Sequence, residues 1–160
     1  MSGGICSIQR KQKRWFHSPP DLMVRSNLME ITVLNSEPLL VKQKQLLEQI
    51  KGRENYFLTI TQGIYETTLV VSENLEQKVE LIFEGEKIKS KFRNLSSITI
   101  QLPADAPRVP GIYSYILKSL AWEGINLVEV VSTCHEFTII LENQNTDRAF
   151  SALNQLFAGI

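Results

Sequence analysis

The sequence contains few of the side chains that bind metals or form disulfides. Of its 160 residues, two are cysteines, Cys6 and Cys134, and two are histidines. The cysteines form no Cys-x-x-Cys pair and belong to no Cys/His cluster, although zinc sites and disulfide frameworks depend on such spacing. We therefore expect no metal site, no disulfide framework and a reducing compartment, the cytoplasm.

Long hydrophobic runs are also missing. No stretch of 18 apolar residues occurs, so we expect no membrane span. The N-terminus lacks the apolar core of a secretory signal. The first 20 residues are basic and contain no Asp or Glu, which leaves an organellar transit peptide open as an alternative.

The chain has no net charge, but its charges are unevenly distributed. It has 17 basic and 17 acidic residues. Residues 1–26 carry five cations and one anion, a balance of +4, so the remainder carries −4. A basic start is typical of a contact with nucleic acid or a membrane, and also of a solvated, poorly ordered terminus. Five cations are few for a nucleic-acid footprint, so we favour the second interpretation and expect no nucleic-acid partner.

Catalytic signatures are missing as well. The sequence has no Walker loop, no Gly-x-Gly-x-x-Gly, no Gly-x-Ser-x-Gly and no His-Glu-x-x-His. Cys134 and His135 are neighbours, but neighbouring residues on a strand point to opposite faces, which does not suit a nucleophile and its base. We therefore expect no catalytic residues, no cofactor and no enzymatic activity.

What the sequence does contain is an internal duplication. Residues 56–74 and 126–143 each hold two apolar, β-branched runs around a short polar turn, as β-hairpins do. At an offset of 70 the two hairpins align, with Glu66 on Glu136. The duplication indicates two copies of a small domain, because a period near 70 is too long for a solenoid repeat.

A helix is predicted before each hairpin. A proline and a glycine 14 residues apart enclose it, Pro38 and Gly52 in the first copy and Pro110 and Gly124 in the second. Proline near a helix start and glycine past its end is the expected asymmetry. The residues that share one face of these helices are Leu39, Leu46 and Ile50, then Ile112, Ile116 and Leu120. Further helices are predicted after the hairpins, with Val79 and Phe83 on one face, then Ala149, Leu153 and Phe157.

Strands are predicted before the first helix of each copy, at 29–34 and 98–102, and a closing strand at 88–94. The resulting βαββαβ order is that of ferredoxin-like modules. We predict an α+β fold of two tandem ferredoxin-like modules, with antiparallel sheets and helices on one face. The predicted divisions are a basic, irregular or disordered arm (1–21), a first module (22–95) and a second module (96–160).

The second module lacks its own C-terminal fourth strand, because its last predicted helix ends close to Ile160. An unpaired sheet edge promotes association, so we expect this edge to be covered. Three candidates remain open: residues 22–25, a neighbouring subunit, or nothing.

The second half of the chain, about 97–157, resembles an ACT domain, a regulatory module of aspartokinases and other enzymes of amino-acid metabolism. The segments that carry the resemblance are Val109-Pro110-Gly111, Glu123-Gly124-Ile125-Asn126, 128–132, 136–141 and Asp147-Arg148-Ala149. The first half, about 29–94, resembles the same module more faintly, through residues 62–66 and the strand after them. The whole chain is similar to stand-alone prokaryotic ACT-repeat proteins of unassigned function.

The resemblance implies a regulatory protein that binds a free amino acid or similar effector between two modules. The loop before the first helix of one module would face the start of the second strand of its partner. The implied effector-binding residues are Asp105, Arg108, Val109, Pro110, Gly111 and Ile112 on one side, with Ile125 and Asn126 on the other. A homodimer or higher oligomer is the implied partner arrangement.

Elementary chemistry supports such a site. Gly111 has no Cβ, so a ligand can approach the backbone closely. Free N–H groups at the helix start favour a carboxylate. The alternative is that Gly111 only serves the turn and Asn126 only caps a strand.

The first half departs from this pattern. Leu39 stands at the position of Gly111, and Tyr56 at that of Asn126. We therefore predict at most one competent kind of effector site per chain, built around the second half. The alternative function is a structural or protein-interaction module with non-functional effector sites, a partner of a transcription regulator or a metabolic enzyme.

Overall fold

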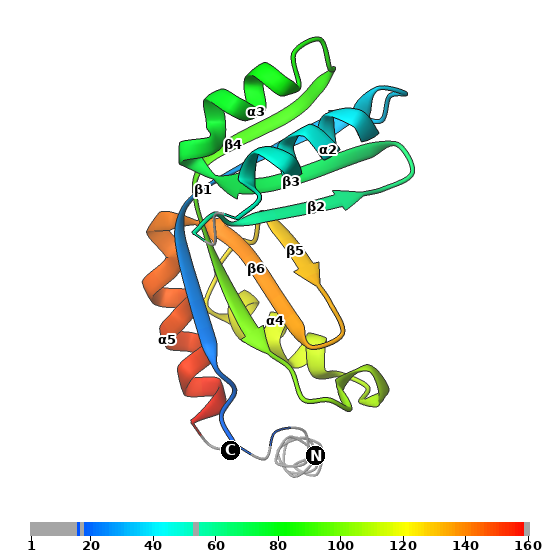
Figure 1. Ribbon diagram of the computed structural model, residues 1–160. Coiled ribbons are helices and arrows are strands. Elements are labelled where there is room, and N and C mark those ends of the chain that lie inside the picture. The colour runs from blue at the N-terminus through cyan, green and yellow to red at the C-terminus, as the bar shows by residue number, and fades with distance from the viewer. Residues whose placement is uncertain (1–15, 17, 53–54, 159–160) are drawn as a thin grey trace. The chain divides into compact units, whose positions relative to one another are not determined.

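The computed structural model describes residue 16 and residues 18–52 and 55–158. Its strands are β1 (Leu22–Leu34), β2 (Leu58–Gln62), β3 (Glu66–Ser72), β4 (Ile88–Gln101), β5 (Glu129–Ser132) and β6 (Glu136–Glu142). Its α-helices are α2 (Leu39–Ile50), α3 (Glu76–Ile82), α4 (Ile112–Trp122) and α5 (Thr146–Phe157). This order confirms the predicted α+β, ferredoxin-like fold class (Figure 1).

The chain divides into two compact units. We call residues 25–96 the first unit, and residues 97–158 together with 16 and 18–24 the second unit. The strands form one six-stranded sheet in the order β2-β3-β1-β4-β6-β5, so the first unit draws on β2-β3-β1-β4 and the second on β1-β4-β6-β5. Within the hairpins, β2 pairs antiparallel with β3, and β5 with β6. Strands β1 and β4 therefore contribute residues to both units.

The missing fourth strand of the second unit is supplied by the start of β1. The Gln101 N–H, at the end of β4, donates to the Asp21 carbonyl at 3.2 Å. Residues 22–24 belong to the second unit by their contacts. The first of the three sequence candidates thus covers this edge of the sheet.

The two long strands were predicted as separate pieces, and the structure joins them. β1 has 13 residues and β4 has 14. Asn27 and Asn94 interrupt them with φ values of 57° and 56°. Asparagine tolerates this left-handed conformation better than most residues. Residues 27–32 and 94–99 share the pattern Asn-Leu-x-x-Ile-Thr, a further signal of the repeat.

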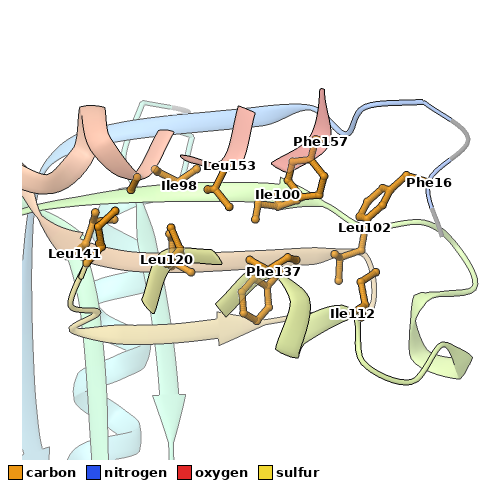
Figure 2. Close-up of a cluster of buried hydrophobic side chains, with 14 of the residues drawn as sticks. Phe16, Ile98, Ile100, Leu102, Ile112, Leu120, Phe137, Leu141, Leu153 and Phe157 are labelled. Atoms are coloured by element: carbon orange, nitrogen blue, oxygen red, sulfur yellow. The ribbon is translucent and has the colours of Figure 1, made fainter. Parts of the chain in front are cut away.

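Each unit buries one face of its sheet under its two helices. In the first unit the core joins Leu39 and Leu46 of α2 to Ile31, Leu69 and Val79. The second core repeats this arrangement (Figure 2). The predicted helix faces are confirmed, because the second core includes Ile112, Ile116, Leu120, Ala149, Leu153 and Phe157. The duplication is also visible between the strands, where Thr32 and Thr68, and Thr99 and Thr138, each hold their hydroxyl oxygens 2.8 Å apart.

One residue of the predicted N-terminal arm, Phe16, packs into a core. Residues 1–15 and 17 lie outside the described residues, and 18–21 form neither helix nor strand. Phe16, however, is only 4% exposed and belongs to the core of the second unit. Its ring meets that of Phe157 edge-on, with centroids 5.1 Å apart (Figure 2). A single aromatic residue has no periodicity, so no sequence pattern marked it as core.

Replacing Phe16 with alanine should destabilise the protein. A buried Phe→Ala change costs about 3–5 kcal/mol in a core, and we expect a loss of that size here. Urea unfolding followed by circular dichroism measures the change. Phe92→Ala is the matched control, since that ring is 48% exposed. Equal stability losses in the two variants would contradict a core role for Phe16.

A group of ion pairs joins α3 to β4 in the first unit. The Lys91 ammonium lies 2.6 Å from Oε1 of Glu76, and the Arg93 Nε donates to the same oxygen at 2.8 Å. The hydrogen bonds from Arg93 and then Lys91 lower the pKa of Glu76 from 4.5 to about 2. The Glu76 side chain is partly exposed, which limits the stability that these contacts supply.

The contribution of Glu76 should disappear in acid. Its folded pKa is depressed, so the stabilisation is present above about pH 4.5 and is lost as the pH falls towards 2. The stability difference between the wild type and Glu76→Gln, measured by urea unfolding, should therefore shrink between pH 5 and pH 2. Glu48→Gln, an exposed carboxylate on α2, is the control. A difference that does not vary with pH would refute this assignment.

Candidate functional site

The loop from β4 to α4 is built from consecutive tight turns. The Ala106 N–H donates to the Pro103 carbonyl at 3.0 Å, and the Arg108 N–H to the Asp105 carbonyl at 2.9 Å. The Val109 N–H continues the series with the Ala106 carbonyl at 3.1 Å. Ala106 is buried in the core, whereas Asp105 and Arg108 are exposed. The buried Ala106 thus anchors the loop to the core, while the side chains of Asp105 and Arg108 lie in solvent.

Gly111 forms the entrance to α4. Its φ of 90° and ψ of 0° place it in the left-handed region, where a side chain is unfavourable. The Tyr115 N–H donates to the Gly111 carbonyl at 3.0 Å, which starts the helix. No side chain caps this end. The first-turn N–H groups, those of residues 112–114, have no acceptor within a helix and carry the positive end of its dipole. The geometry therefore suits an anionic group.

An aromatic pair lies beside this helix start, and the sequence analysis missed its role. The rings of Tyr113 and Phe137 stack with centroids 5.0 Å apart. The Tyr113 hydroxyl lies 3.1 Å from Oγ of Ser132, the last residue of β5. The end of β5 therefore lies next to the start of α4. The only sequence signal was the position of Tyr113, two residues after Gly111.

Ile125 and Asn126 lie at the other end of α4. Gly124 adopts a φ of 66°, its N–H donates to the Ala121 carbonyl at 3.0 Å, and the Ile125 N–H donates to the Leu120 carbonyl at 3.0 Å. These two bonds form a Schellman motif. Ile125 is 5% exposed and packs in the core, while Asn126 is exposed.

The structure thus separates the predicted site residues into two groups. Residues 105–112 gather at the start of α4, and Ile125 and Asn126 follow its end. The 11 residues of α4 correspond to a helix about 16 Å long. A single small ligand cannot contact both groups of one unit, so a site that uses both requires two modules.

The corresponding loop of the first unit has a different construction. It contains four residues (35–38), whereas the loop of the second unit contains ten (102–111). The Asn35 amide donates to the carbonyls of Gly63 and Ile64 at 2.9 and 3.1 Å. Pro38 stands at the start of α2 with a φ of −75°, so this helix has no glycine entrance. The side chain of Asn35 thus holds this short loop against the turn between β2 and β3.

Neither a metal cluster nor a membrane-spanning helix occurs in the described part of the chain. In residues 16, 18–52 and 55–158, no three His, Cys, Asp or Glu side chains gather at a distance suited to a metal ion. The helices within the same residues are all too short or too polar to cross a membrane.

Comparison with known proteins identifies the fold. No family model and no curated protein matches the sequence. Among solved structures, aspartate kinase from Clostridium acetobutylicum is similar at a TM-score of 0.69 and 14% identity, over 85% of this chain and 34% of that one. The regulatory subunit of aspartate kinase from Thermus thermophilus, in a ligand-free form, gives 0.67 and 14%, over 85% and 96%. Aspartokinase III from E. coli, in complex with lysine and aspartate, gives 0.61 and 12%, over 88% and 33%.

These matches confirm that the fold is the ACT-type fold of aspartate kinase regulatory domains. The chain spans about one third of the full-length kinases and nearly all of the separate regulatory subunit. Identities this low establish the fold alone.

Substituting the helix-entrance glycine should reveal how much its conformation matters to folding. Gly111→Ala forces an L-residue into the left-handed region, which costs about 1–2 kcal/mol. Gly124→Ala is the matched control, because its φ is also positive and an added Cβ meets nothing within 4 Å. We expect similar losses in the midpoint of urea unfolding. A neutral Gly111→Ala substitution would show that the entrance does not need this conformation.

Proposed function

We propose that this chain is a non-catalytic regulatory protein whose second unit binds an amino acid at the start of α4. The observation that carries the proposal is Gly111, which opens an uncapped helix in the left-handed conformation. The carboxylate of the effector accepts hydrogen bonds from the first-turn N–H groups. Arg108 and Asp105, exposed in the preceding loop, are available to its charged groups.

Two further observations support an amino acid as the effector class. The solved structures with this fold are regulatory parts of aspartate kinases, and E. coli aspartokinase III is bound to lysine and aspartate. The aromatic pair of Tyr113 and Phe137, with the Ser132 hydroxyl, lies beside the helix start and supplies both apolar and polar contacts. We assign no kinase activity to this chain, because it spans nearly all of a separate regulatory subunit and only about one third of the kinases.

The proposal includes a second copy of the chain. Ile125 and Asn126 are too far along α4 to reach a ligand at Gly111, so a partner module completes the site. Strand β5 lies at an edge of the second unit, and sheet edges are common places of association. The Val130 N–H on this strand is bonded to its neighbour's carboxylate, Oε1 of Glu129, at 3.1 Å. That carboxylate must move away before a partner strand pairs there. Because a partner module completes the effector site, effector binding and association are coupled equilibria.

Binding should be measured by calorimetry and thermal unfolding with each of the twenty amino acids, lysine and aspartate first. An effector at 100 times its dissociation constant should stabilise the protein by about 2.7 kcal/mol. We expect Gly111→Ala to weaken binding at least tenfold, whereas Gly52→Ala in the first unit, whose φ is also positive and whose added Cβ meets nothing within 4 Å, should bind like the wild type. Analytical ultracentrifugation should show a shift in oligomeric state on binding.

Two results would contradict the proposal. One is the absence of heat and of thermal stabilisation with all twenty amino acids. The other is equal binding by the Gly111→Ala and Gly52→Ala variants, which would leave Gly111 as a turn residue only.

A protein-interaction module is the second candidate, and one observation favours it. Ile64 and Tyr65, at the turn between β2 and β3, are 86% and 80% exposed, and Leu40 on α2 is 71% exposed. The turn is bonded to Asn35 and therefore lies beside the entrance to α2. Exposed apolar side chains that form a contiguous patch mark binding surfaces. A pull-down that captures the same protein with wild type and Gly111→Ala, but not with Ile64→Asp, would favour this candidate.

A further inference from the structure

A buried carboxylate lies at the start of α2 in the first unit. The Glu86 side chain is 5% exposed, and both of its oxygens are occupied. The Ser36 hydroxyl donates to Oε2 at 2.6 Å, and the Lys42 ammonium lies 2.8 Å from Oε1. Ser36 precedes α2 by three residues, and Lys42 is the fourth residue of the helix. The carboxylate therefore sits beside the first turn of α2.

A short turn after α3 positions the carboxylate of Glu86. Gly85 has a φ of 83°, which reverses the chain directly after the helix. The Glu86 N–H donates to the Phe83 carbonyl at 3.0 Å, and the Leu34 N–H donates to the Lys87 carbonyl at 3.0 Å. These bonds hold Glu86 between the end of α3 and the end of β1. Its position is therefore determined by backbone as well as by side-chain contacts.

The second unit has the same helix-to-helix contact but, among its described residues, no carboxylate that corresponds to Glu86. The fourth residue of α4, Tyr115, donates its hydroxyl to the Leu156 carbonyl near the end of α5, at 3.1 Å. Lys42 makes the equivalent contact in the first unit, with the Glu84 carbonyl at 2.6 Å. Each side chain thus links the first turns of one helix to the chain at the end of the other helix in its unit. Only Lys42 also brings a positive charge that can hold a carboxylate.

We propose that the first unit contains a carboxylate-binding site, formed by Ser36 and Lys42, whose permanent ligand is the side chain of Glu86. This unit therefore takes no effector and keeps the packing of α2 against α3 at all effector concentrations. The inference rests on the proposed function only in treating the start of the first helix as the effector position. The contacts from Lys42 and then Ser36 lower the pKa of Glu86, so the built-in ligand keeps its charge further into acid than an ordinary glutamate does.

Removal of the built-in ligand should open the site to a free carboxylate. Glu86→Ala is titrated with sodium acetate against sodium chloride at equal ionic strength, and thermal unfolding is recorded. We expect acetate alone to stabilise the variant in a saturable way, by about tenfold in the folded-to-unfolded ratio at ten times its dissociation constant. The wild type and Glu84→Ala, which loses a neighbouring exposed carboxylate, should respond no more to acetate than to chloride.

A Glu86→Ala variant that unfolds equally in both salts would overturn the proposal, and so would an equal acetate response in the Glu84→Ala control. If the variant is unfolded without acetate, the test is whether acetate restores its circular dichroism, and failure to do so counts against the proposal. A second measurement uses a folded protein: carbon-13 NMR of Glu86 in the wild type, Ser36→Ala and Lys42→Met. We expect its pKa to rise in each variant; an unchanged pKa would refute the assigned contacts.

These outcomes are separable from those of the proposed function. The wild type and Glu86→Ala share an unchanged second unit, so acetate binding at Gly111 would affect both equally. A response confined to Glu86→Ala supports the built-in ligand even if none of the twenty amino acids binds the wild type.

Discussion

The structure depends on two long strands, β1 and β4, that each contribute residues to both units of one six-stranded sheet. Each unit needs four strands beneath its two helices, and the described residues supply six strands in all. β1 and β4 meet this requirement because each is long enough to serve both units. Their left-handed asparagines, Asn27 and Asn94, stand at equivalent places in the repeat. The same sharing removes the open edge of the second unit, because the chain preceding the first module pairs with β4.

The two units share one arrangement of strands and helices, but they differ at the start of their first helix. In the second unit a ten-residue loop ends in Gly111, and the helix N–H groups are left without a side-chain cap. In the first unit a four-residue loop is fastened by Asn35, and Glu86 brings a carboxylate from the same chain. One duplicated element thus yields one helix start without a side-chain cap and one with a carboxylate of the same chain beside it.

Much of the fold was predictable because its information is local. The helix faces that contain Ile112, Ile116 and Leu120, and the paired hairpins, follow from periodicity within 10 to 20 residues. Phe16 and Glu86 were not predictable, since a lone aromatic and a lone acid carry no pattern. Their roles depend on contacts with Phe157 and with Ser36 and Lys42, which are distant in sequence. The site was partly predictable: Gly111 had a signal, whereas its neighbours Tyr113 and Phe137 were assigned no role there.

The sequence by itself determined the duplication, the βαββαβ order and the contrast between Gly111 and Leu39, because these depend on residue type and spacing alone. Tertiary structure decided which strand completes the second sheet, which residues surround each helix start, and that Asn126 lies a helix length away from Gly111 in the same unit. The physical reason is that periodicity reports which side of an element is buried. It does not report which distant segment covers that side or which end of a helix a loop residue reaches.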